Sequence, residues 1–285
     1  MAASNRWETA FGYARDFLDN RFVYVVISPR AHGLSVGINM NPDRLCNYDC
    51  VYCEVDRTSP IRARELDVPV MIEELKRTLA MARDNRLRAR PGLASLPEEL
   101  LVPRHVALSG DGEPTISPKF APALEALAHL RALEELPFFK IVLVSNGTAI
   151  DHPPVWRALQ TLTNQDEVWL KLDGGTAAYL EHINRPTVPL ERVLKNILLL
   201  GRHRPVVIQS LFARFERQEP EEAEIEAYVD RLVELQNGGA QISLVQIYSA
   251  MRPTMLPDCG HLPLRTLSRI AHLVRDRTGL RVHVF

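Results

Sequence analysis

The chain has 285 residues, of which 46% are hydrophobic and 24% are charged, and its formal net charge is −1. These values are ordinary for a globular protein and exclude disorder or coiled coil over the whole chain. The balanced charge excludes a global basic field that would attract nucleic acid, although a local basic patch stays open. The length suits one large α/β domain, so we expect a single domain over residues 1–285, with a core at about 28–250 and a C-terminal helix and strand at 260–285.

The N-terminal residues 1–15 are polar and mixed in charge, without the apolar centre of a signal peptide. Apolar runs such as residues 141–144 are far shorter than the roughly 20 residues that a membrane-spanning helix needs. We therefore expect a cytoplasmic protein without a membrane partner.

Short apolar and β-branched runs recur along the chain and predict strands. The predicted strands are residues 22–27, 35–39, 105–109, 140–145, 167–172, 206–211, 242–247 and 281–285. Most of these runs are continuously apolar rather than alternating, which is typical of parallel strands buried on both faces.

Amphipathic stretches lie between the predicted strands and predict helices. They cover residues 70–88, 118–135, 153–161, 189–201, 221–236 and 263–278. Pro189 is expected to begin one helix and Gly201 to end it. The alternation of strand and helix predicts an α/β fold with a parallel sheet, from a partial (β/α)6 barrel to a full TIM-like barrel. A doubly wound open sheet is the alternative.

Three of the four cysteines, Cys46, Cys50 and Cys53, form a C-x3-C-x2-C pattern. A disulfide framework spreads its cysteines along a small secreted chain, so this clustering favours metal ligation in a reducing compartment. Thiolates are the usual ligands of iron–sulfur clusters, and three thiolates on four irons leave one iron open to a small molecule. A zinc site would normally need a second spaced pair. Zinc or a chance grouping of free thiols is the alternative, and Cys259 has no assigned role.

A glycine-rich turn, Ser109-Gly110-Asp111-Gly112-Glu113-Pro114, follows the predicted strand 105–109. Gly110 and Gly112 would let the backbone approach a ligand at the carboxyl end of a strand, where barrel enzymes place their sites. Glu113 would offer an acceptor to an ammonium group. The alternative is a tight turn between strand and helix.

Polar residues also follow several later strands. They are Asn146, Lys171, Asp173, Arg185, Gln209 and Tyr248. Each alone could be a helix cap or a turn residue. Their repetition at one predicted edge of the sheet favours a binding site.

Two motifs resemble the signatures of the radical S-adenosylmethionine (SAM) superfamily. They are the cysteine loop, in which Tyr52 precedes the last cysteine, and the turn from Gly110 to Pro114. The segments 36–39 and 183–186 narrow the resemblance to wyosine-synthesis enzymes and their uncharacterised bacterial relatives. It covers roughly residues 28–250. The chain departs from the pattern at Asp111, inserted between the glycines, and lacks the extra cysteines of a second cluster.

The resemblance implies a [4Fe–4S] cluster held by Cys46, Cys50 and Cys53, with SAM on the open iron. It also implies SAM contacts from Gly110, Gly112, Glu113 and Asn146. Weaker candidates for SAM or substrate are Lys171, Asp173, Arg185, Gln209 and Tyr248.

The implied reaction is reductive cleavage of SAM to a 5′-deoxyadenosyl radical, which abstracts hydrogen from a substrate. An electron donor such as flavodoxin or ferredoxin is implied as a partner. The substrate stays open among a small molecule, RNA and protein, with tRNA base modification as one candidate. The alternatives are an activating enzyme for a glycyl radical protein and a non-catalytic iron–sulfur or zinc module.

Overall fold

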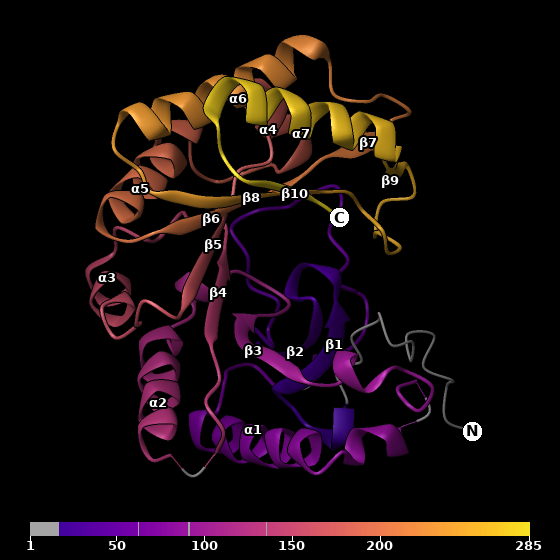
Figure 1. Ribbon diagram of the computed structural model, residues 1–285, viewed down its shortest axis with the longest axis vertical. Coiled ribbons are helices and arrows are strands. Elements are labelled where there is room, and N and C mark those ends of the chain that lie inside the picture. Colours follow the sequence, from indigo (N-terminus) through magenta and orange to yellow (C-terminus); the bar gives the residue numbers. More distant parts are fainter. Residues whose placement is uncertain (1–16, 62, 91, 135) are drawn as a thin grey trace. The chain divides into compact units, whose positions relative to one another are not determined.

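The computed structural model describes residues 17–285 except residues 62, 91 and 135 (Figure 1). The chain forms two compact units, each assembled from segments that are far apart in the sequence. The first unit comprises residues 1–45, 61–143 and 157–166, and the second comprises residues 46–60, 144–156 and 167–285. The cysteine loop therefore belongs to the second unit and the glycine-rich turn to the first. The single domain expected from the sequence stays a prediction.

The first unit is built on strands in the order β1-β2-β3-β4. Their bounds are β1 (Val23–Ser28), β2 (Gly33–Asn39), β3 (Pro103–Ser109) and β4 (Ile141–Ser145), the last of which runs on into the second unit. β2, β3 and β4 are parallel, whereas β1 and β2 are antiparallel. Its helices are α1 (Val68–Arg83) and α2 (Phe120–Ala132), with short 3-10 turns at Phe17–Asp19, Pro29–Ala31, Arg86–Ala89, Glu98–Leu100 and Pro114–Ile116.

Buried carboxylates fix the ends of these elements. Glu74 of α1 accepts the backbone N–H groups of Arg21 and Phe22 at 2.8 and 2.9 Å, which holds the chain as it enters β1. Asp166 accepts the N–H of Ile141 at 2.8 Å and is paired with Arg131. Burial acts to raise the pKa of Asp166, but the hydrogen bonds from Arg131 and the backbone outweigh it and lower that pKa.

The second unit contains parallel strands in the order β5-β6-β8-β10. Their bounds are β5 (Glu167–Lys171), β6 (Val206–Leu211), β8 (Ile242–Tyr248) and β10 (Val282–Val284). A separate antiparallel pair joins β7 (Ala213–Phe215) to β9 (Cys259–His261). The helices are α4 (Ala177–Ile183), α5 (Leu190–His203), α6 (Glu222–Asn237) and α7 (Leu264–Thr278), and α3 (Pro153–Leu159) crosses the boundary between units. Figure 1 shows α5, α6 and α7 along one face of β6, β8 and β10.

The two faces of this second sheet differ in chemistry. Side chains alternate between the faces of a strand, and register partners in neighbouring strands share a face. On one face, Ile208 pairs in register with Val245, and both are fully buried. On the other, the register sets Lys171 beside Gln209, Gln209 beside Gln246, and Gln246 beside His283. A polar row therefore crosses four neighbouring strands on the face opposite Ile208 and Val245.

All eight predicted strands are confirmed to within a few residues, and so are the six predicted helices. The sequence analysis missed α4 and the β7–β9 pair. The expected end of a helix at Gly201 is wrong, because α5 continues to His203. A Cβ at Gly201 would lie 2.8 Å from Ala240 Cβ, so this glycine provides room for close packing. The first two strands are antiparallel because the turn Pro29–Ala31 is too short for a parallel crossover.

In the part of the chain that the structure describes, no helix is both long enough and apolar enough to cross a membrane.

Candidate functional site

The cysteine loop is held by main-chain hydrogen bonds to the segment that follows α4. The N–H of Asp49 donates to the carbonyl of Asn184 at 3.0 Å, and the N–H of Val51 donates to that of Ile183 at 2.9 Å. The N–H of Thr187 donates in return to the carbonyl of Asn47 at 3.0 Å. The loop therefore has a fixed path, and Cys46, Cys50 and Cys53 lie along it as partly buried thiols that form no disulfide.

A second set of bonds ties the loop to the turn after β4. Asn47 Nδ2 donates to Thr148 Oγ1 at 2.7 Å, and Asn146 Nδ2 donates to Asn47 Oδ1 at 2.8 Å. Asn146 Oδ1 accepts from Thr148 Oγ1 at 2.8 Å. From α5, Asn196 Nδ2 donates to the carbonyl of Gly147 at 2.8 Å. The nitrogen of Asn146, a predicted SAM residue, thus braces the cysteine loop, and its oxygen holds the Thr148 side chain that accepts from Asn47.

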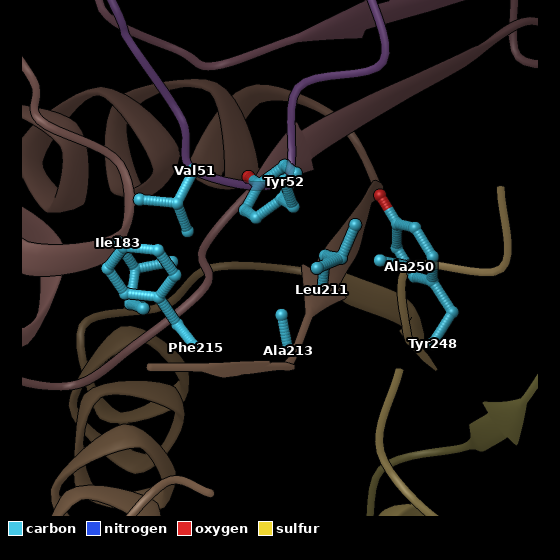
Figure 2. Close-up of a cluster of buried hydrophobic side chains, with 8 residues drawn as sticks. All are labelled: Val51, Tyr52, Ile183, Leu211, Ala213, Phe215, Tyr248 and Ala250. Atoms are coloured by element: carbon cyan, nitrogen blue, oxygen red, sulfur yellow. The ribbon is translucent and has the colours of Figure 1, made fainter. Parts of the chain in front are cut away.

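The underside of the loop is apolar. Tyr52 and Val51 belong to a buried cluster that also contains residues from the carboxyl ends of β6 and β8 (Figure 2). The remaining members are Ile183, Leu211, Ala213, Phe215, Tyr248 and Ala250. Cys50 and Cys259 pack against this cluster. Its burial fixes the loop over the strand ends through the hydrophobic effect.

A buried polar network lies beside the apolar cluster and is centred on Asp173. Asp173 Oδ1 accepts the N–H of Leu211 at 2.7 Å, while Oδ2 accepts the hydroxyl of Tyr52 and Nδ2 of Asn184, the latter at 2.8 Å. Asn184 Nδ2 also lies 3.4 Å from Cys50 Sγ. Lys171 Nζ is 3.4 Å from Tyr52 Oη and 4.9 Å from the centre of its ring, within cation–π range.

Burial sets the protonation of two groups in this network. It raises the pKa of the Cys50 thiol to about 11, with Lys171 acting in the opposite direction and Asp173 adding to the rise. Burial, followed by the Asp173 carboxylate, raises the pKa of Tyr52 well above its ordinary value. Without iron, Cys50 is therefore a neutral thiol at pH 7. Since a metal takes the thiolate, iron binding at Cys50 would release a proton.

The glycine-rich turn belongs to the first unit and packs tightly on its own neighbours. Gly110 has φ +124°, and a Cβ there would lie 2.7 Å from Asn39 Cα. A Cβ at Gly112 would lie 1.9 Å from the carbonyl oxygen of Leu45, the residue before Cys46. Asn39 Oδ1 accepts the N–H of Asp111 at 3.0 Å, and its Nδ2 donates to Asp111 Oδ2 at 2.7 Å. Asn39 thus accommodates the inserted Asp111.

Glu113 is buried, with 3% of its surface exposed. Its Oε1 accepts from the backbone N–H and the hydroxyl of Thr115, at 3.0 and 2.6 Å, so that it caps the short helix Pro114–Ile116. The N–H of Glu113 donates to the carbonyl of Leu45 at 3.1 Å. One carboxylate oxygen of this predicted SAM residue therefore has a local structural role.

The structure brings Cys50, Lys171 and Asp173 together in the second unit. Gln209 Nε2 donates to Gln246 Oε1 at 3.1 Å within the polar row, and Tyr248 lies in the apolar cluster. Arg185 is partly exposed and lies 3.5 Å from Asp49.

Sequence reasoning missed Asn39, Asn47 and Asn184 as site residues. The signal for two of them was present, because Asn39 and Asn184 lie in segments 36–39 and 183–186, on which the resemblance depends. Nothing in the spacing of the sequence indicates which side chains they contact.

The donor set determines which metal group the loop suits. Within the described residues, no three His, Cys, Asp or Glu side chains converge on a single metal ion. A closed zinc site takes four such ligands around one ion, whereas the loop itself supplies three thiols. A four-iron cluster takes each thiolate on a different iron, which suits three thiols spread along one loop. The backbone N–H of Tyr48 points at Cys46 Sγ at 3.5 Å, and the side chain of Asn184 donates to Cys50 Sγ at 3.4 Å. Such N–H donors suit thiolate ligands. The residues therefore fit an iron–sulfur cluster.

No family model matches the chain. A UPF0026 protein of Helicobacter pylori strain J99 is 26% identical over 178 residues, which are 62% of this chain and 50% of that protein. A UPF0026 protein of Methanocaldococcus jannaschii is 27% identical over 178 residues, 60% of this chain and 47% of that protein. The chain spans about half the length of the curated relatives it matches.

Solved structures resemble the chain over most of its length. TYW1 with a lysine-pyruvate adduct bound matches with a TM-score of 0.62 and 16% identity over 93% of this chain and 85% of that one. A radical SAM methyltransferase from Sphaerobacter thermophilus matches with a TM-score of 0.63 and 15% identity, over 92% of this chain and 68% of that one. The fold is that of radical SAM enzymes. Streptococcus suis SuiB bound to S-adenosylmethionine matches with a TM-score of 0.60 and 15% identity, over 90% of this chain and 52% of that one.

These matches confirm two predictions from the sequence. The chain has the α/β fold with a mostly parallel sheet that is found in the partial barrels of radical SAM enzymes. The resemblance to that superfamily, with TYW1 as a wyosine-synthesis protein among the neighbours, is confirmed at the level of the fold.

Proposed function

We propose that this protein is a radical SAM enzyme whose [4Fe–4S] cluster is held by Cys46, Cys50 and Cys53. The observation that carries the proposal is the C-x3-C-x2-C loop, whose thiols form no disulfide and which is fixed over the strand ends of the second unit, in a chain with the radical SAM fold. When bound, the cluster supplies an electron to SAM, whose sulfonium cleaves to methionine and a 5′-deoxyadenosyl radical for hydrogen abstraction. We propose flavodoxin or ferredoxin as the type of electron donor.

The chain's own residues would position the cofactors and limit access of water. Main-chain bonds from Ile183 and Asn184 hold the cysteine loop, and the Tyr52 ring closes its apolar underside. We propose that Gly110, Gly112, Glu113 and Asn146 bind SAM. A buried carboxylate such as Glu113 suits an ammonium group because a charge-assisted hydrogen bond is stronger than a neutral one.

We assign Lys171, Asp173, Gln209 and Tyr248 to SAM or substrate binding. Lys171 and Gln209 are register partners in the polar row of the second sheet. Amide and ammonium groups of this kind would bind a substrate through hydrogen bonds.

Structural neighbours do not agree on a substrate. TYW1 is bound to a lysine-pyruvate adduct, whereas SuiB is bound to the precursor peptide SuiA. The substrate class is therefore open among a small molecule, RNA and protein, and tRNA base modification stays a candidate. RNA binding would be recognised by retention of tRNA that falls steeply as salt rises.

The experiment is an anaerobic preparation of the full chain, reconstituted with iron and sulfide and then given SAM and dithionite. We expect four irons per chain and formation of 5′-deoxyadenosine, measured by chromatography. The Cys46→Ala variant is expected to reduce 5′-deoxyadenosine formation by at least about 100-fold, since even residues behind metal ligands contribute roughly 10- to 100-fold. Cys259→Ser is the matched control and is expected to keep iron content and product. A full cluster in Cys46→Ala, or one zinc per chain without brown colour, would contradict the proposal.

A further inference from the structure

The carboxamide of Asn184 is buried, with 1% of the residue exposed, and its orientation is fixed. Nδ2 lies 2.8 Å from Asp173 Oδ2 and 2.9 Å from Tyr52 Oη. An ionised carboxylate only accepts hydrogen bonds, so exchange of the amide N and O would place two acceptors face to face. The N–H group must therefore point to Asp173, and the same nitrogen then lies 3.4 Å from Cys50 Sγ.

The acceptor that orients Asn184 is itself held in place. Asp173 receives the N–H of Leu211 and the hydroxyl of Tyr52. The chain just after Asp173 is held by the buried carboxylate of Glu224, which accepts the hydroxyl and the N–H of Thr176 at 2.6 and 3.2 Å. This support leaves Asn184 little freedom to turn away from Cys50.

Asn184 Oδ1 is buried and has no hydrogen-bond partner within the described residues. A buried acceptor without a partner costs stability. The carboxamide nitrogen has two hydrogens and three acceptors within reach. Asp173 and Tyr52 are hydrogen-bonded to each other and can share one N–H group, which leaves the second for the Cys50 thiol. The side chain is therefore held with one N–H group toward the Cys50 sulfur, although its amide oxygen is then left without a hydrogen bond within the described residues.

We propose that Asn184 is a positioning residue that raises the reduction potential of the cluster through an N–H···S hydrogen bond to Cys50. This inference rests on the proposed function. Reduction adds one electron, and the added negative charge is shared with the ligand sulfurs. A hydrogen bond to a ligand sulfur stabilises that charge and is a recognised determinant of cluster potential. Cys46 receives its N–H from the backbone of Tyr48, which the change of a side chain other than to proline leaves in place, whereas the Cys50 donor is a side chain.

The test is a redox titration of the reconstituted full chain without SAM, followed by electron paramagnetic resonance. Dithionite supplies one electron, which takes the cluster from the 2+ to the 1+ state without breaking a bond or moving a proton. We expect Asn184→Ala and Asn184→Leu to lower the equilibrium constant for reduction about tenfold, which is a midpoint about 59 mV more negative for a one-electron couple.

The matched control is Asn47→Ala. Asn47 braces the same loop through Thr148 and Asn146, at 2.7 and 2.8 Å. We expect less than a twofold change in its reduction equilibrium. An unchanged potential in the Asn184 variants, an equal shift in Asn47→Ala, or loss of the cluster from both Asn184 variants would overturn the inference. A wild-type chain that takes up no cluster would refute the proposed function as well. If the wild-type chain forms 5′-deoxyadenosine and the Asn184 variants keep the wild-type potential, the proposed function stands and only the role of Asn184 is refuted.

Discussion

The cysteine loop of the second unit and the glycine-rich turn of the first are the two recognisable motifs of the chain, yet their residues are used differently. In the loop, backbone groups and the side chains between the cysteines carry the structure, and no disulfide links the thiols of Cys46, Cys50 and Cys53. In the turn, the motif residues themselves carry it, because Gly112 packs on Leu45 and Glu113 caps a helix. A motif residue can thus be required for its chemistry or for the backbone path that it permits.

The largest effect that separates the two motifs is a loss of stability at alkaline pH, to which Cys50 and Tyr52 of the cysteine loop both contribute. The pKa of Cys50 is raised from 9.0 to about 11 in the folded chain. The neutral thiol is favoured by folding, so its contribution is complete below pH 9 and is lost as pH rises toward 11. At 1.36 kcal/mol per pKa unit, the Cys50 share of the loss in the metal-free chain is up to about 2–3 kcal/mol.

Urea unfolding of the metal-free chain at a series of pH values measures this loss. Cys50→Ser, which does not ionise in this range, should reduce the loss by the Cys50 share, and Cys259→Ser should reduce it less. The buried tyrosines Tyr52, Tyr179 and Tyr228, whose pKa values are also raised, keep part of the loss in both variants. An identical loss in wild type and Cys50→Ser would show that other groups account for all of it.

A smaller effect is expected in the turn. Gly112→Ala places a Cβ 1.9 Å from the carbonyl of Leu45, so the backbone must move. Overpacking of this kind costs about 1–3 kcal/mol. The control is Gly260→Ala, where the nearest atom is the end of the Arg214 side chain at 3.4 Å. Thermal unfolding measures both variants, and equal stability of the two would mean that the tight packing of Gly112 is unimportant.

The sequence predicted most of the fold because its signals are local. Continuous apolar runs such as residues 141–144 indicate buried parallel strands, and the cysteine spacing is legible without a structure. The helix α4 (Ala177–Ile183) was missed because two turns are too short to show a period. The strands β7 and β9 have three residues each and are defined by each other.

The cysteine ligands of the candidate site could be predicted from the sequence, whereas the side chains that hold them in place could not. Asn184 contacts Cys50 across 134 positions of sequence, and Asp173 contacts Tyr52 across 121. Gly201 resembles a helix end locally, but its packing against Ala240 lets the helix continue. Such partners depend on tertiary packing, which a local pattern does not encode.

The central claim is that three thiols hold a cluster whose remaining iron binds SAM. Electron paramagnetic resonance of the reduced, reconstituted chain, recorded with and without SAM, tests it most directly. The account predicts a reduced-cluster signal whose g values change on addition of SAM and do not change with S-adenosylhomocysteine added at the same low concentration. A signal that SAM leaves unchanged, or a protein that binds zinc in place of iron, would contradict it.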